Sequence, residues 1–382
     1  MRRPRLRGDV VEQILSHHLT PFAVMTRNQP RLGFTLVELM VAIVIIGILM
    51  TITVTAVQRA IVTGRQTAMR MEVNALAGAV EQYFAKYGDY PPDGSSEAVL
   101  MGHMRKIFPR MSPLDRSLLQ QLVQHRSSGD FSEVAMDRAE ALVFFLGGFS
   151  DNPINPLTGE GGPLVLGPGV DSSDATAIQN IANYQYNATR DNAFFDFDLN
   201  RLTIGRANDT APLLSTDEVL LGVNEPGHGG RDPLPTYLAR VDNPTPIVYF
   251  DSRTYGQLPT GIYNGYLAGT GSEFGGVRPY MTAALGGGTG NPNDLQFHNR
   301  ETFQIISPGL DGVFGSMVSV DAGNPGAAPV YFITETGEAF GPVSPAPSIN
   351  GFQDGDWLGL GVNGHLDNVT NFSTSTLESD LQ

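Results

Sequence analysis

The chain contains no cysteine, which excludes disulfides, thiolate metal sites and cysteine nucleophiles. Charged residues are also scarce, at 16% of 382 residues, whereas 44 Gly and 26 Pro are present. This mixture disfavours a helical bundle and favours a loop-rich, partly β body. A chain of this length has room for the core of one or two domains.

Positive charge is concentrated at the N-terminus. Residues 1–33 carry six Arg against Asp9 and Glu12, a net +4, so the formal net charge of −15 leaves −19 for the remainder. An acidic body has no electrostatic attraction for phosphate backbones, and we therefore expect no nucleic-acid binding.

The common catalytic motifs are missing too. The sequence has no G-x-S-x-G, no H-E-x-x-H and no phosphate-binding loop. The seven histidines are scattered, and the one adjacent pair, His17-His18, lies near the N-terminus. We expect surface or structural roles for His228, His298 and His365, and no enzymatic activity.

One long apolar run is present instead, from Leu39 to Val57, nineteen residues without a charge. A bilayer core needs roughly 20 apolar residues in a helix, so this run is long enough to span a membrane. Arg27 and Arg31 before it are expected to stay cytoplasmic. A signal peptide usually has a shorter apolar core, followed by an A-x-A-like cleavage site that is absent here. A plain membrane anchor explains the run equally well.

A plain anchor does not explain Glu38, because a carboxylate within an apolar membrane segment costs about 2.5–3.5 kcal/mol at mid-bilayer, and less near the interface. The segment from Arg31 to Glu38, RLGFTLVE, resembles the type IV prepilin cleavage and methylation motif. The resemblance implies that a prepilin peptidase cuts between Gly33 and Phe34 and methylates the new N-terminus at Phe34. It also implies that Glu38 pairs with the N-terminal amine of a neighbouring subunit, since two charges that are unfavourable alone are tolerated as a pair.

On this interpretation residues 1–33 are a leader peptide. They form a long leader for the family, and Met25 begins a nine-residue alternative, MTRNQPRLG, of more usual length. We therefore expect either that translation starts at Met25 or that residues 1–24 are dispensable.

The apolar periodicity becomes amphipathic beyond Val57 and predicts one helix over about 35–87, ended by Gly88 and the following prolines. Its membrane-spanning part is expected at about 36–57. The segment 75–91, ALAGAVEQYFAKYGDYP, resembles the end of the long helix in the major pseudopilin of type II secretion. This second resemblance favours a secretion-type subunit over an adhesive pilus.

The resemblance implies an α+β, pilin-like fold in which residues 34–90 form the helix that packs on a small antiparallel sheet. Residues 91–245 are expected to be a large helical and loop-rich insertion, and residues 246–382 the β-rich part of the body. The composition predicts helices at 96–108, 113–125 and 132–146, and a strand at 193–204. Short aromatic and β-branched runs predict strands at 246–251, 302–306 and 330–334.

Calcium is the one metal for which the sequence of the body contains candidate ligands. Residues 307–315, SPGLDGVFG, resemble a C-terminal loop of major pseudopilins, which have a calcium site there. This resemblance makes Asp311 a candidate ligand, with Asp354, Asp356 and the Asp367-Asn368 pair as further oxygen donors. Asp-Gly is also an ordinary turn dipeptide, so structural turns are the alternative. The tail 365–373 resembles that of large pilin-like proteins of the planctomycete type.

Three functions are consistent with these patterns. The first is a pilin-like subunit of a type II secretion pseudopilus or type IV pilus-like filament, assembled from the inner membrane with other subunits and an assembly platform, its body outside the cytoplasm. The second is a minor pilin or tip binding module, favoured by the large insertion. The third is a membrane-anchored periplasmic enzyme or carbohydrate-binding protein, which would keep an intact N-terminus.

Overall fold

The computed structural model describes residues 34–123, 136–205, 213–215, 232–240, 243–255, 277–283, 295–314, 331–337, 339–340 and 365–381. Its contacts divide the chain into two compact units, residues 1–58 and 59–382. The division falls one residue after the apolar run.

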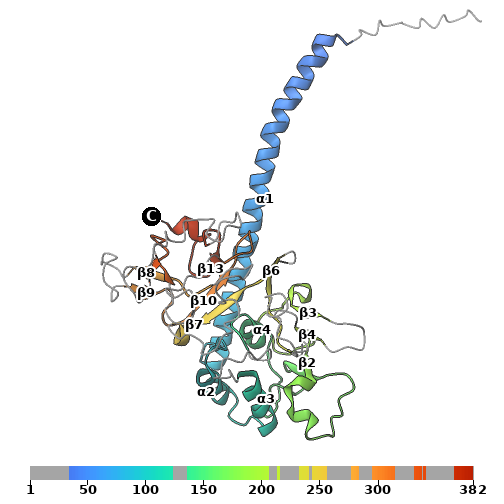
Figure 1. Ribbon diagram of the computed structural model, residues 1–382, viewed down its shortest axis with the longest axis vertical. Coiled ribbons are helices and arrows are strands. Elements are labelled where there is room, and N and C mark those ends of the chain that lie inside the picture. The colour runs from blue at the N-terminus through green and yellow to red at the C-terminus, as the bar shows by residue number, and fades with distance from the viewer. Residues whose placement is uncertain are drawn as a thin grey trace, which may run out of the picture. The chain divides into compact units, whose positions relative to one another are not determined.

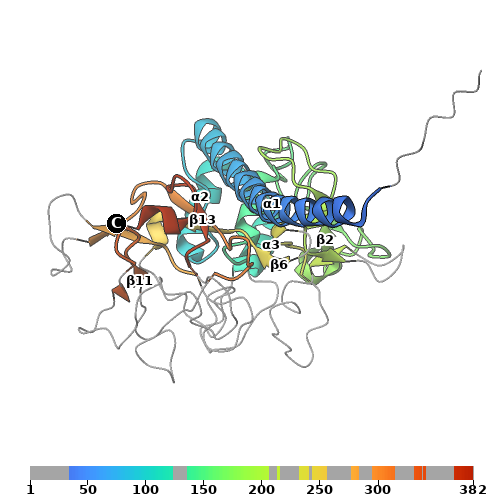
Figure 2. The same cartoon turned by 90° about the horizontal axis from the view of Figure 1, so that it is seen from above.

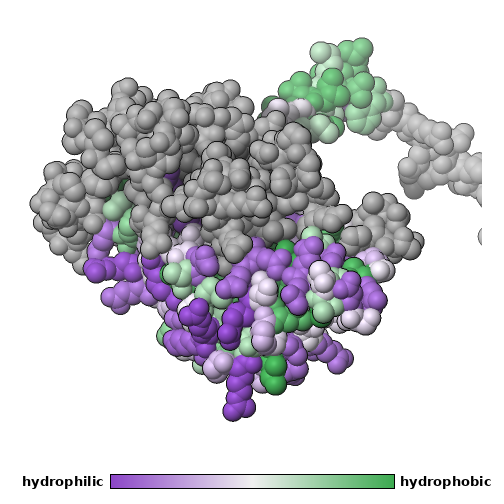
Figure 3. Space-filling view, turned by 60° about the horizontal axis from the view of Figure 1, so that its bottom comes forward, coloured by the Kyte–Doolittle hydropathy of each residue, from purple (hydrophilic) through white to green (hydrophobic). Residues whose placement is uncertain are grey.

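Helix α1 spans Leu36–Tyr87, 52 residues, and confirms the predicted helix (Figure 1). It ends where the sequence indicates: Gly88 has a φ of +68°, which favours glycine, and its N–H donates to the carbonyl of Phe84 at 2.7 Å. The side chains of the apolar run are exposed, and Figure 3 shows an exposed hydrophobic stretch on this helix. Within the described ranges, α1 is the helix that is long and apolar enough to cross a membrane.

Three shorter helices follow α1 in the second unit: α2 (Glu97–Ile107), α3 (Pro113–Val123) and α4 (Glu140–Leu146). Two match their predicted positions, although the residues after 123 lie outside the described part. The third prediction began too early, because residues 136–139 are not helical. The carboxylate of Asp137 accepts the N–H groups of Ala139 and Glu140 at 2.8 Å each, in a turn that precedes the first helical residue, Glu140.

The strands are short and pair antiparallel. The largest described sheet has three strands in the order β13-β10-β7, and the other strands form two-stranded pairs. The strands are β1 (Leu164–Leu166), β2 (Tyr184–Tyr186), β3 (Ile204–Gly205), β4 (Leu214–Ser215), β5 (Leu238–Arg240), β6 (Asn243–Pro246), β7 (Val248–Asp251), β8 (Met281–Ala283), β9 (Leu295–Phe297), β10 (Phe303–Ser307), β11 (Tyr331–Phe332), β12 (Ala339–Phe340) and β13 (Val369–Thr370).

The predicted strands at 246–251, 302–306 and 330–334 appear as β7, β10 and β11. The sheet is buried on both faces, which explains why β7 and β10 read as continuous apolar runs without alternation. Tyr249 and Ile305 face the core that contains one side of α1, whereas Phe250 and Ile306 belong to a second cluster. The ribbons of α2 and α3 lie near the second half of α1 (Figure 2). The first core contains buried side chains of α1, α2, α3 and α4: Val73, Leu76, Val80, Tyr83, Leu100, Met104, Leu118 and Phe145.

The predicted strand at 193–204 is wrong for most of its length. The N–H groups of Phe194 and Phe195 both donate to the carbonyl of Leu146, at 2.8 and 3.2 Å, so they are not available to a strand partner. Asp198 then caps a turn of 3-10 helix at Leu199–Arg201, and strand structure begins only at β3. The aromatic rings of this segment pack elsewhere: Phe194 contacts Tyr83 and Tyr87 of α1. Phe195 and Phe197 contact Tyr237.

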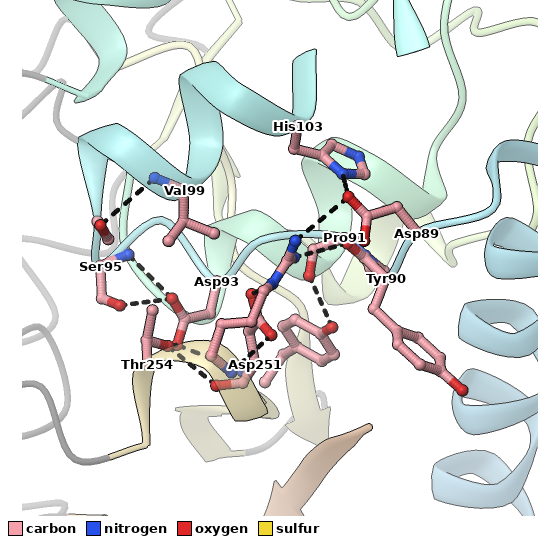
Figure 4. Close-up of polar contacts among 12 residues, drawn as sticks. Asp89, Tyr90, Pro91, Asp93, Ser95, Val99, His103, Asp251 and Thr254 are labelled. Atoms are coloured by element: carbon pink, nitrogen blue, oxygen red, sulfur yellow. Dashed lines mark hydrogen bonds and ion pairs between the residues drawn. The ribbon is translucent and has the colours of Figure 1, made fainter. Parts of the chain in front are cut away.

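A group of ionisable side chains, here called the turn cluster, holds the end of α1 to the body (Figure 4). It consists of Asp89, Asp93, His103, Asp251 and Arg253. The Asp93 carboxylate is almost fully buried and accepts hydrogen bonds from Arg138 at 3.1 Å and Thr254 at 2.7 Å. Asp89 contacts His103 at 2.9 Å and Arg253 at 3.2 Å, and Arg253 also pairs with Asp251 at 2.7 Å. The cluster thus joins the turn after α1 to α2 and β7.

His103 is neutral in this cluster, because burial lowers its pKa to about 4 although the Asp89 carboxylate acts in the opposite direction. Its Nδ1 lies 2.9 Å from Asp89, and its Nε2 lies 2.7 Å from the hydroxyl of the buried Tyr83. A carboxylate only accepts, so Nδ1 donates to Asp89 and Nε2 accepts from Tyr83. The histidine therefore links the α1 core face to the turn through one fixed tautomer.

We predict that His103→Gln makes the free energy of unfolding less dependent on pH. In the wild type the pKa of His103 is about 4 folded, against about 6.5 unfolded. The unfolded chain therefore gains a proton first, and stability falls by up to about 3 kcal/mol from pH 6.5 to 4. The raised pKa of Asp251, about 6, has the opposite sign, but it is present in both proteins. Denaturant titrations across this range should give a steeper acid loss for the wild type, and equal slopes would contradict the assignment.

Candidate processing and assembly site

The prepilin-like motif lies at the start of α1, and the described residues begin within it. Gly33 lies outside the described residues, while Phe34 is 78% exposed. The exposed Phe34 therefore lies just before the first residue of α1, Leu36. The structure does not test the processing itself.

Glu38 makes a reciprocal cap with Thr35 that the sequence interpretation missed. The Glu38 carboxylate accepts the backbone N–H of Thr35 at 2.9 Å and its hydroxyl at 3.0 Å. In return the Thr35 hydroxyl accepts the N–H of Glu38 at 3.2 Å. This is the capping-box pattern, Thr followed three residues later by Glu at a helix start. The T-x-x-E spacing, visible in the sequence, was the signal for it.

The second candidate site is the loop from Ser307 to Phe314, which the structure brings against the tail. The Asp367 carboxylate accepts the N–H groups of Leu310 and Asp311, at 2.6 and 3.0 Å. Gly309 has a φ of +71°, and a Cβ there would lie 2.4 Å from the Asp367 carboxyl carbon. Burial and the neighbouring Asp311 raise the pKa of Asp367 to about 7. Asp311 and Asp367, predicted as oxygen donors, are therefore close neighbours.

These residues fit a calcium ion by chemical type. The Oδ1 atom of Asp367 and the Oδ1 atom of Asn368 are buried without a hydrogen-bond partner among the described residues. Calcium takes 6–8 oxygen ligands, and two carboxylates and an amide oxygen supply only part of that number. No group of three acidic or histidine side chains with metal-ligand geometry occurs in the described ranges. Asp354 and Asp356, the other two candidates, lie outside those ranges, so calcium binding stays a prediction.

We expect calcium to raise the melting temperature of the protein by a few degrees over an EGTA-treated sample. A ligand at a hundred times its Kd stabilises the folded state by about 2.7 kcal/mol. Asp311→Asn should reduce the rise, whereas Asp171→Asn, at an exposed position, should leave it unchanged. Magnesium serves as the ion control, because it requires a tighter octahedral shell. Equal melting temperatures with calcium and EGTA would favour the structural-turn interpretation.

Comparison with known families gives one match, to the prokaryotic N-terminal methylation motif, over residues 29–54. No curated protein and no solved structure matches the chain. The match covers the segment whose geometry is given above, including Phe34, the Thr35–Glu38 cap and most of the apolar run. The motif implies processing by a prepilin peptidase and assembly with other pilin subunits in general. Together with α1, this match supports a membrane-anchored, single-pass, type IV pilin-like protein.

Proposed function

We propose that this protein is a structural subunit of a type II secretion pseudopilus, with no catalytic activity. The observation that carries the proposal is the methylation motif, which overlaps the start of a 52-residue helix whose first half is exposed and apolar. Such a helix can rest in the inner membrane before assembly and pack against other subunits afterwards. The segment 75–91, which resembles the major pseudopilin, supports the secretion branch over a pilus.

Body orientation is part of the same proposal. The six arginines of residues 1–33 outnumber the three, Arg59, Arg65 and Arg70, that follow the apolar run in α1. The positive-inside tendency then keeps the leader cytoplasmic and places the body on the other side of the inner membrane. A cytoplasmic leader is also where the assembly platform and the peptidase would meet the precursor.

A minor pilin or tip module is the second candidate, and the folded insertion favours it. Residues 91–205 contain α2, α3, α4 and a two-stranded sheet, rather than a simple connection between α1 and the three-stranded sheet. A tip subunit is rare in the filament, whereas a major subunit is abundant. Quantifying this protein in purified filaments separates these two roles. An anchored enzyme or carbohydrate-binding protein, the third candidate, predicts an uncut N-terminus.

We predict that the native chain begins at N-methyl-Phe34. Mass spectrometry of the N-terminal peptide from cell membranes measures this directly, with a strain lacking prepilin peptidase as the reference. Gly33→Leu should accumulate as the uncut precursor. The matched control is Gly47→Ala, a position with open space around it in the middle of the apolar run, which should be cut normally. An uncut wild-type chain, or a cut beyond Val57, would exclude the pilin pathway.

We further predict that Glu38→Gln is cut and methylated but forms at least tenfold fewer filaments. Gln also completes a capping box, so this change removes the charge and leaves the helix cap available. Thr35→Val is the converse variant, because it removes the cap hydroxyl and keeps the carboxylate. Filament yield is counted by electron microscopy of sheared fractions. Normal yield with Glu38→Gln and low yield with Thr35→Val would assign Glu38 to capping alone and would contradict charge pairing between subunits.

A further inference from the structure

Cationic side chains gather where α2 joins α3, over residues 105–116. They are called the basic corner here, and all are exposed: Arg105, Lys106, Arg110 and Arg116. The acidic residue of the same stretch, Asp115, is buried, and its carboxylate accepts the N–H of Leu157 at 2.7 Å and the hydroxyl of Thr158 at 2.6 Å. Asp115 is therefore held inside the body, and the surface of the corner is cationic.

The guanidinium groups of the corner have no counter-charge among the described residues. Arg105 and Arg110 form no hydrogen bond or ion pair there, and Arg116 donates to a backbone carbonyl at 3.5 Å. Lys106 differs, because its ammonium lies 3.7 Å from the Asp89 carboxylate of the turn cluster. The three arginines thus present uncompensated positive charge to the solvent.

The segment 150–191, which contains β1 and β2, carries the opposite charge and is called the acidic lobe here. Its five acidic residues are exposed, and in the described part of the chain none of them forms an ion pair: Asp151, Glu160, Asp171, Asp174 and Asp191. The single cation of the lobe, Arg190, donates to the carbonyls of Val143 and Phe144 at 2.9 and 2.6 Å. Five carboxylates against one guanidinium leave the lobe a formal net charge of −4.

Helix α3 separates the corner from the lobe within one chain. Figures 1 and 2 show α3 between α2 and β2. The lobe attaches near the C-terminal end of α3, where the Gln121 side chain donates to the carbonyl of Gln179 at 2.8 Å. The corner lies towards the opposite end, and this eleven-residue helix is about 16 Å long. Within the described ranges, neither group therefore meets its counter-charge in its own chain.

A second copy of this chain offers the matching surface. Residues 34–382 carry a formal net charge of −19, so two bodies repel each other unless local charges of opposite sign meet. The corner of one copy and the lobe of another are such a pair. Joining them leaves one copy with a free lobe and the other with a free corner. Repetition of a head-to-tail contact of this kind builds an open helical filament when its rotation does not close a ring.

We propose that the basic corner of one subunit docks on the acidic lobe of the next subunit in the filament. This contact rests on the proposed filament role, and it adds a contact between bodies to the charge pairing of Glu38. Exposed ion pairs are individually weak, so the contact acts through several of them together and weakens as the salt concentration rises. Electrostatic complementarity decides which surfaces meet, and hence the register of the bodies.

Charge reversal in the full chain tests the contact. Arg105→Glu/Arg110→Glu should lower the yield of sheared filaments about tenfold, because each of two exposed ion pairs contributes a few-fold. Asp171→Lys/Asp174→Lys should lower the yield similarly, and combining the four changes should restore it to within about twofold of the wild type. Arg300→Glu is the control, because it reverses an exposed arginine outside both surfaces and should keep the wild-type yield.

Wild-type yield of either double variant, or no recovery in the combined variant, would overturn the contact. So would an Arg105→Glu/Arg110→Glu chain that forms normal filaments but no longer binds vesicles of phosphatidylglycerol, which would assign the corner to an anionic lipid surface. Arg105→Gln/Arg110→Gln, which removes the charge without reversing it, should give a smaller loss, and circular dichroism verifies the folding of each variant.

Mass spectrometry of the N-terminal peptide separates this contact from the filament role. A wild-type chain that is uncut at Phe34 would overturn both. Cut chains whose filament yield is unchanged by charge reversal would overturn the contact alone.

Discussion

Helix α1 exposes the large apolar side chains of its first half and buries one face along its second half, and the body is organised around that face. Val73, Leu76, Val80 and Tyr83 have at most negligible exposure and lie in the largest described core cluster. Because the body covers α1 along only part of its length, the apolar run needs another apolar environment to cover its side chains. For the apolar run that environment is lipid, or equivalent helices of other subunits. The sheet and the short helices therefore have to attach to the half that remains in water.

Attachment depends on the few residues after the helix as much as on the core. Gly88 stops α1, and the following turn delivers Asp89 and Asp93 to partners on α2, on β7 and before α4. Asp93 is buried with an ion pair and several hydrogen bonds, so loss of its charge would remove the ion-pair partner of the buried Arg138. The polar turn thus fixes the direction in which the body leaves the helix, which apolar contacts alone do not determine.

Much of this fold and of the motif site could be predicted from the sequence, because their signals are local. The apolar run, Gly88 and the register from Gly33 to Glu38 are each read within a few residues, and so are the apolar runs of β7 and β10. The prediction of a strand at 193–204 is wrong because the carbonyl of Leu146, distant in the sequence, accepts hydrogen bonds from the N–H groups of Phe194 and Phe195. The turn cluster was also not predictable, since Asp93 and Arg138 meet only after folding.

Glu38 shows how one side chain can serve two states of the same protein. In the single chain it caps α1 with Thr35, and such a cap is worth about 1 kcal/mol. Placing a carboxylate within an apolar membrane segment costs about 2.5–3.5 kcal/mol at mid-bilayer. The cap therefore offsets only part of the penalty wherever the residue lies deep in the apolar layer. A positive amine from another subunit would remove more of it, so the proposed charge pairing of Glu38 would favour assembly over the isolated membrane state.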